Sequence, residues 1–346
     1  MMGVSISEIV SSKTIDLDAL RGQIIAVDTF NFLYQFLATI RGPDGSPLTN
    51  ARGQITSHLI GLISRTTNLM GHGIKFVFVI DGETPQLKQE ERKRRKQLKE
   101  DAQKEYEVAK EQGDYEAMKK FASRTSRLTP AMLEDAKEII DLLGLPIVQA
   151  PMEGEAQAAA MAAKGDVDAI ASQDFDSLLF GAPRVIRNLS ITGRRRVAGK
   201  QAYTQVLPAE VTLQDVLDEL QIDREQLVIL GILVGTDFNY GGVKGIGPKK
   251  ALKLLAEHGH DFDKIFEKVE WGKHFDTDWR SIQELFHKMP FTADYDLCWN
   301  DPQTDKLSRL LVDKHGFDQD RTDRMLSALA KQQEASKQKG LSDFFS

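Results

Sequence analysis

The stretch IIAVDTFNFLYQFL (residues 24–37) predicts a short buried strand that is followed by a polar turn and a helix. Its first four residues form a continuous apolar run, which is typical of a strand covered on both faces of a parallel sheet. Similar runs occur in KFVFVI (75–80), LPIVQA (145–150) and DAIAS (168–172). The sequence therefore predicts an α/β protein with a mainly parallel central sheet and helices on both faces.

Helical patterns alternate with these strands and continue toward the C-terminus. Apolar residues recur at helical spacing in TSHLIGLISRTTNLM (56–70) and AMLEDAKEIIDLLG (131–144). From Asp215 onward the pattern is helical, through QLVILGILVG (226–235) and GIGPKKALKLLAEHG (245–259). We expect one compact body with appendages, although 346 residues also accommodate two domains.

The composition excludes several protein classes. An apolar content of 41% provides material for a buried core. No apolar run reaches the roughly 18 residues of a membrane span, and residues 1–16 lack the pattern of a signal peptide, so we expect neither insertion nor secretion. The single cysteine, Cys298, cannot form an intramolecular disulfide, and no Cys pair or HExxH spacing offers a zinc site.

Charge is distributed unevenly along the chain. The formal net charge is -6, whereas proteins that bind phosphates usually carry a basic excess. A charged region from about 86 to 127, with a break at Gly113 and Asp114, predicts two helices that project from the body. Its segment 88–99 holds seven Lys or Arg against two Glu. On a helix, four of these cations fall on one face: Lys88, Arg92, Arg95 and Lys99.

Acidic residues follow the predicted strands at the points where they end. Because the carboxyl ends of parallel strands meet at one edge of a sheet, we expect these side chains to converge there. Such carboxylates would repel each other unless cations neutralise them, and oxygen ligands without His or Cys favour two Mg²⁺ ions, or Mn²⁺. A metal pair of this kind hydrolyses phosphodiesters. The candidate ligands are Asp28, Asp81, Glu153, Glu155, Asp174, Asp176 and, after an apolar helix, Asp237.

Other interpretations of these residues exist. A single Asp after a strand is most often a helix N-cap or a turn residue. A metal-dependent ribonuclease or a phosphatase could use the region of Asp28, but aspartyl-phosphate phosphatases need a second Asp where Phe30 stands. A catalytically silent DNA-binding adaptor is the alternative from another class, yet it has no reason to keep seven repelling carboxylates together.

The segment VKGIGPKKALKLL (243–255) predicts a helical hairpin. Gly245 and Gly247 would let backbone N–H groups approach a phosphate at a helix N-terminus, with charge added by Lys249 and Lys250. An ordinary glycine-containing turn is the alternative. A contact of this kind would hold duplex backbone regardless of base sequence.

Taken together, these segments resemble the structure-specific 5′ flap endonucleases of archaea and eukaryotes, within the XPG-type nucleases and their PIN-like fold. The resemblance covers nearly the whole chain, in the order and approximate spacing of the family. The strings that support it are VDTFNFLYQFL (27–37), FVFVIDGETPQLK (76–88), APMEGEAQAAAMA (150–162), ASQDFDSLLFG (171–181), VGTDFN (234–239), GIGPKKA (245–251) and QKGLSDFF (338–345).

The resemblance implies roles for individual residues. The seven acids match the metal ligands of the family, and Lys88 and Arg95 match a basic pair that contacts the scissile phosphate. Tyr34 matches an aromatic residue on which a base stacks. Further DNA contacts are implied at Gly3, Arg41, Arg65, Arg92, Gly245, Gly247, Lys249 and Lys250. The family has Gly directly after the initiator Met, whereas here Met2 precedes Gly3.

The resemblance also implies an organisation and partners. The nuclease body would span 1–325, with an N-terminal part (about 1–100), a helical arch (about 86–127) that a 5′ single strand threads, and an internal part (about 128–260). The internal part includes a helix-two-turn-helix (about 228–258) that can hold K⁺. A flexible tail (326–346) would dock on a sliding clamp (PCNA) through Gln338, Leu341, Phe344 and Phe345.

The resemblance also implies a cellular process and a compartment. The expected protein is a monomer that removes 5′ flaps, with 5′–3′ exonuclease activity, in Okazaki-fragment maturation and base-excision repair. It would work in the cytoplasm and nucleoid of an archaeon or in the nucleus of a eukaryote.

Overall fold

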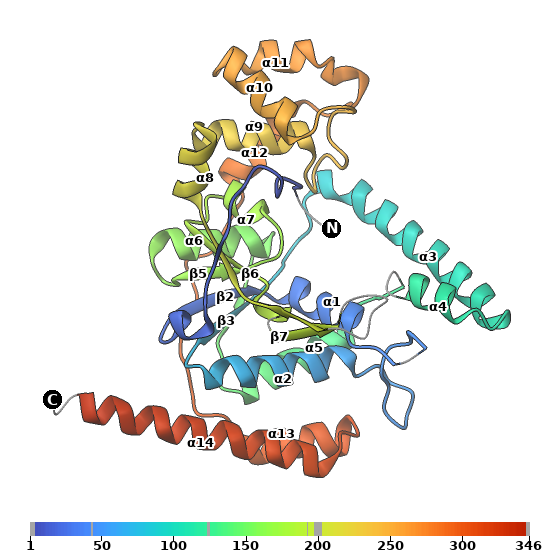
Figure 1. Cartoon of the computed structure of the whole chain (residues 1–346), viewed down its shortest axis with the longest axis vertical. Coiled ribbons are helices and arrows are strands. Elements are labelled where there is room, and N and C mark those ends of the chain that lie inside the picture. The colour runs from blue at the N-terminus through green and yellow to red at the C-terminus, as the bar shows by residue number, and fades with distance from the viewer. Residues whose placement is uncertain (1–3, 43, 123–124, 192, 197–202, 344–346) are drawn as a thin grey trace.

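The fold has a β-sheet at its centre, with helices around it (Figure 1). The structure is a computed structural model that describes residues 4–42, 44–122, 125–191, 193–196 and 203–343. In this part of the chain the sheet has seven strands in the order β1-β9-β6-β5-β2-β3-β4. Their bounds are β1 (Lys13–Thr14), β2 (Ile24–Asp28), β3 (Lys75–Ile80), β4 (Ile147–Gln149), β5 (Ala169–Ala171), β6 (Arg184–Arg187) and β9 (Ala209–Thr212).

The sheet is mainly parallel, as predicted. Strands β6, β5, β2, β3 and β4 are parallel to their neighbours, and β9 and β1 extend the β6 edge in antiparallel pairing. The four strands predicted from the sequence are β2 to β5. The other strands were not predicted, because their sequences lack a continuous apolar run. They include a separate hairpin of β7 (Gly193–Arg196) and β8 (Tyr203–Val206).

Helices cover both faces of the sheet, because successive side chains of a strand point to opposite sides. In β3, Phe76 and Phe78 face one buried cluster, and Val77 and Val79 face the other. The first cluster lies under α1 (Thr29–Thr39), α2 (Ser57–Gly71) and α5 (Pro130–Leu142). The second lies under α6 (Gly154–Lys164), α7 (Asp176–Leu179), α8 (Leu213–Leu220) and α9 (Arg224–Val234).

Two helices project from this body, as the charged region predicts. They are α3 (Gln89–Glu111) and α4 (Tyr115–Ala122), which pack on each other and stand clear of the sheet (Figure 1). We call these two helices, together with Lys88 at the N-cap of α3, the arch. Gly113, with a φ of 67°, lies in the turn between them. The base of the arch begins just after β3 and lies beside the segment that follows α9.

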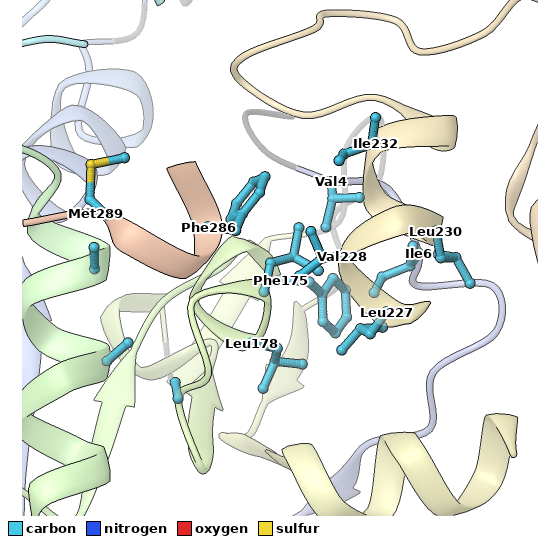
Figure 2. Close-up of a cluster of buried hydrophobic side chains, with 14 of the residues drawn as sticks. Val4, Ile6, Phe175, Leu178, Leu227, Val228, Leu230, Ile232, Phe286 and Met289 are labelled. Atoms are coloured by element: carbon cyan, nitrogen blue, oxygen red, sulfur yellow. The ribbon is translucent and has the colours of Figure 1, made fainter. Parts of the chain in front are cut away.

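The second cluster extends into a helical layer beyond the sheet. Figure 2 shows Val4 and Ile6 of the N-terminal segment beside Leu227, Val228 and Ile232 of α9. The further helices of this layer are α10 (Pro248–His258), α11 (Phe262–Lys268) and α12 (Trp279–Lys288). A 3₁₀ turn at Trp271–Lys273 and α12 agree with the helical pattern expected from Asp215 onward.

The C-terminal region differs from its prediction. After α13 (Thr304–Arg309), α14 runs over Gln319–Asp343 and packs on α2, and a helix therefore continues across 326, where we expected a flexible tail to begin. Its residues include several Ala, Leu, Lys and Gln, which favour helices. No helix among the described residues has the length and apolar character to cross a membrane.

Candidate active site

The parallel strands deliver carboxylates to one edge of the sheet. Asp28 ends β2 and caps α1, where it accepts a hydrogen bond of 3.0 Å from the backbone N–H of Asn31. Asp81 follows β3 and accepts one of 2.6 Å from the N–H of Gly154, the first residue of α6. The common N-cap interpretation is thus correct for Asp28, and both carboxylates still face the same edge.

The next strand adds its own acids. Asp176 begins α7 after β5 and accepts a hydrogen bond of 2.9 Å from the N–H of Val4. Asp174 accepts one of 3.3 Å from Nδ2 of Asn31. Glu155, in the first turn of α6, accepts from the hydroxyls of Ser172 and Ser177. These bonds orient the carboxylates without neutralising them.

Two cations from the arch enter the site. Lys88 Nζ lies 2.6 Å from Glu153 Oε2 and 3.1 Å from Asp237 Oδ2. Arg95 Nη2 lies 2.5 Å from Asp237 Oδ1. Asp237 follows the buried helix α9, so the arch, the sheet edge and the helical layer all meet at this point.

The pKa values report how closely the acids are packed. Burial first, then the carboxylates of Asp174 and Asp237, raises the pKa of Asp176 to about 8. Burial also raises the pKa values of Asp28, Asp81 and Asp174 to about 6, with neighbouring acids adding to the shift. The pKa of Glu155 lies well above its usual value for the same reasons.

Asp237 behaves differently from the other acids. Burial would raise its pKa, but Lys88 and Arg95 hold it below its usual value. Burial would likewise lower the pKa of Lys88, but Glu153 and Asp237 raise it above the usual range. The arch cations therefore neutralise one side of the site, whereas the side around Asp176 retains uncompensated acids.

The donor set fits a hard divalent cation. All seven side chains offer carboxylate oxygens, and such ligands suit Mg²⁺ or Mn²⁺ rather than zinc. As the side chains lie, no three acids among the described residues are arranged to hold a single ion. Glu153 and Asp237 are instead engaged by Lys88. Loading a metal would therefore require these two acids to exchange a cation partner.

Arg92 and Lys99, the other two cations of the predicted helix face, contact protein groups nearby. Nη1 of Arg92 donates to Oγ1 of Thr84 at 2.5 Å, in the loop after β3. Nζ of Lys99 lies 4.5 Å from the ring centroid of Tyr34 on α1. The ring of Tyr34 is partly exposed and has a cation over it, so a stacking base would have to share or replace this contact.

Arg41 contacts residues outside the carboxylate cluster. Arg41 donates to the carbonyl of Gly45 at 2.9 Å and to the hydroxyl of Ser126 at 2.5 Å. Arg41 and Arg65 are both partly buried, and burial lowers the pKa of each. Arg41 therefore also joins the loop after α1 to the segment after α4.

The hairpin has the predicted shape. Gly245 has a φ of 85°, which favours glycine, and Gly247 is the N-cap of α10 with Pro248 in the first turn. Nζ of Lys250 donates to the carbonyl of Gly245 at 2.9 Å, and Lys249 is exposed beside it. A groove beside the hairpin is also lined by Lys244 and Lys253.

Several site residues were not predicted from the sequence. Arg187 ends β6, where its guanidinium lies 4.4 Å from the ring centroid of Phe175 and its charge acts on Asp174. The strand-end rule would have found it if β6 had been recognised. Asn31 follows Asp28 by one helical turn and bridges it to Asp174. Only the fold reveals that bridge.

The predicted clamp-docking residues lie at the end of the chain, and Gly3 lies at its start. Gln338 and Leu341 lie within α14. Gly3, Phe344 and Phe345 lie outside the described residues.

Comparisons with known proteins agree with this geometry. Residues 2–102 match the XPG N-terminal domain and residues 144–237 the XPG I-region. The chain is 48% identical to flap endonuclease 1 of Pyrococcus furiosus over 344 residues, covering 99% of each. It is 38% identical to the solved flap endonuclease-1 from Methanococcus jannaschii, with a TM-score of 0.75, over 95% of this chain and 98% of that one.

A more distant structure shares the fold alone. The catalytic core of Rad2 in complex with DNA substrate is 24% identical, with a TM-score of 0.66, over 92% of this chain and 96% of that one.

Proposed function

The chain belongs to the flap endonuclease family, and we propose that it cuts DNA near the base of a 5′ single-stranded flap, using the carboxylate cluster and two arch cations. Members of this family are metal-dependent nucleases that hydrolyse phosphodiester bonds, which excludes a silent adaptor and an aspartyl-phosphate phosphatase. The observation that carries the proposal is the convergence of seven acids from β2, β3, α6, α7 and the end of α9 with Lys88 and Arg95.

The acids would hold two Mg²⁺ ions, for which Mn²⁺ can substitute. When bound, such ions activate a water and stabilise charge on the attacking and leaving oxygens. The chain's own contribution is to fix the acids before DNA arrives. Asn31 holds two carboxylates in place, and the N–H groups of Gly154 and Val4 hold one each. The raised pKa values around Asp176 express a repulsion that a cation would relieve.

Lys88 and Arg95 would hold the scissile phosphate. Both now neutralise Asp237, and Lys88 also pairs with Glu153. With Glu153 and Asp237 serving as metal ligands, Lys88 and Arg95 would donate instead to the phosphate oxygens, where charge develops in the transition state. The two side chains thus have an anionic partner both before and after substrate binds.

The surrounding elements would select DNA by shape. Tyr34 would stack on a base near the cut, and the arch would pass the 5′ single strand. The hairpin around Gly245 and Gly247, with Lys249, Lys250 and a K⁺ ion, would hold duplex backbone. Arg41, Arg65, Arg92 and Gly3 would add phosphate contacts near the junction. None of these contacts reads base sequence, so specificity would follow the structure of the DNA.

The C-terminal residues would recruit the protein to its place of work. Gln338, Leu341, Phe344 and Phe345 would dock a monomer on a sliding clamp during Okazaki-fragment maturation and base-excision repair. Removal of nucleotides in the 5′–3′ direction would follow from the same site.

Cleavage of a labelled double-flap DNA tests the proposal. We expect incision confined to the 5′-flap junction with Mg²⁺ and none with EDTA. Single-stranded DNA, blunt duplex and a 3′ flap of the same sequence serve as controls. Equal cutting of the 3′ flap, or cutting that persists in EDTA, would overturn the proposed specificity or metal dependence.

A further inference from the structure

The base of the arch is tied to the segment after α9 by two neighbouring arginines. The guanidinium carbon of Arg94 lies 3.5 Å from the ring centroid of Tyr240, and Nη2 of Arg95 lies 2.5 Å from Asp237 Oδ1. Asp237 and Tyr240 belong to one short loop that leads into the hairpin. Two adjacent residues of α3, Arg94 and Arg95, therefore contact two residues of this loop.

A buried acid links the two arginines to each other. Glu91, one helical turn earlier, is only 5% exposed and accepts from Arg94 Nε at 2.6 Å and Nη2 at 2.8 Å. It also accepts from Arg95 Nε at 2.7 Å. Burial would raise the pKa of Glu91, but the two arginines hold it below its usual value. Because a bidentate pair fixes the plane of a guanidinium, Glu91 couples the orientation of Arg94 to that of Arg95.

The loop that carries Tyr240 is firmly held. Asn239 accepts from Oγ1 of Thr236 at 2.7 Å and donates from Nδ2 to the carbonyl of Ile232 at 2.7 Å. Tyr240 itself is 56% exposed and belongs to neither buried cluster. Its ring therefore lies at the surface on a hydrogen-bonded loop, and the cation over its face is Arg94.

We propose that Tyr240 and Arg94 form a positioning pair that holds the base of the arch where Lys88 and Arg95 reach the reacting phosphate. The inference rests on the proposed function, in which Lys88 and Arg95 contact that phosphate. Tyr240 acts through Arg94 and Glu91 on Arg95, and does not touch substrate. Gly245 of the hairpin lies five residues beyond Tyr240. The same loop therefore connects the hairpin, which would hold duplex DNA, to the base of the arch.

Replacement of the ring separates positioning from binding. We expect Tyr240→Ala to lower the single-turnover cleavage rate at saturating protein by about two- to fivefold, the loss expected for a surface cation–π contact. We expect unchanged affinity for flap DNA in EDTA and an unchanged unfolding midpoint. Tyr240→Phe keeps the ring face and loses only the hydroxyl that interacts with Arg94, so it should recover most of the wild-type rate. Phe291→Ala removes an exposed aromatic elsewhere and serves as the matched control.

A double-mutant cycle identifies the partner. If the pair acts as a unit, Arg94→Gln combined with Tyr240→Ala will cleave no more slowly than Arg94→Gln alone. The inference would be overturned if the rate losses of the two single variants multiply in the double variant. It would also be overturned if Tyr240→Ala cleaves at the wild-type rate, or if Tyr240→Phe is as slow as Tyr240→Ala. A wild-type protein that leaves flap DNA uncut would overturn the proposed function itself, which distinguishes the two failures.

Discussion

Asp176→Asn should stabilise the metal-free protein while abolishing cleavage. Asp176 is 6% exposed and begins α7, and its Oδ1 accepts a hydrogen bond from the N–H of Val4. An asparagine oxygen can accept the same bond, so the change removes a charge and keeps the shape. We therefore attribute its expected effect on stability to the buried carboxylate alone.

The magnitude follows from the raised pKa of Asp176. Between the ordinary value of 3.8 and the folded-state value of about 8, the folded chain holds a proton that the unfolded chain has lost. Stability therefore falls as the pH rises through this window. Up to about pH 7 roughly three pH units are crossed at 1.36 kcal/mol each, which gives at most about 4 kcal/mol. Asparagine has no proton to lose and escapes this cost.

Urea unfolding in EDTA measures the effect. From about pH 5 to about pH 8 we expect the wild type to lose stability with rising pH more steeply than Asp176→Asn. Asp305→Asn, at an exposed carboxylate of α13, is the control and should follow the wild type. With Mg²⁺ the wild type should gain stability and the variant should gain less, because a ligand that binds only the folded state stabilises it. A variant less stable than the wild type at about pH 7 in EDTA would refute the reasoning.

Three further predictions concern other parts of the chain. Lys88→Gln should lower the single-turnover cleavage rate on the order of 10²-fold in a flap-cleavage assay. It should also leave Glu153 and Asp237 less neutralised, which an unfolding curve would detect. A cleavage rate near that of the wild type would argue against contact between Lys88 and the phosphate. Burial lowers the pKa of His58 from 6.5 to about 4, so acidification across that window should cost up to about 3 kcal/mol of stability, and His58→Leu should flatten this dependence in urea titrations at several pH values. Truncation before Gln338 should leave basal cleavage intact and remove stimulation by a sliding clamp, so stimulation that survives the truncation would contradict the docking role.

The sequence was sufficient to predict where the acids lie, because strand ends are a local property. The apolar runs that form β2, β3, β4 and β5 are each followed within a few residues by Asp or Glu. In a parallel sheet those ends must share one edge, so convergence followed without any coordinates. The arch was equally predictable, since its charge and its break at Gly113 are visible in the sequence.

Local sequence patterns did not predict the short strands β6, β9 and β1. β6, β9 and β1 owe their conformation to pairing with one another and not to an apolar run of their own. Arg187 was missed with β6 for this reason. The helix across 326 was also unexpected, because composition suggested a polar tail while contact with α2 supports helix α14.

By itself, therefore, the sequence determined the α/β class, the acidic edge of the sheet and the projecting helices, since the spacing of apolar residues encodes each of them over a few neighbours. The tertiary structure alone decided which charges meet. Lys88 reaches Glu153 across 65 positions and Arg95 reaches Asp237 across 142. Arg94 meets the ring of Tyr240 from an equally distant segment. Partners so far apart in the chain are selected by packing, which no local pattern records.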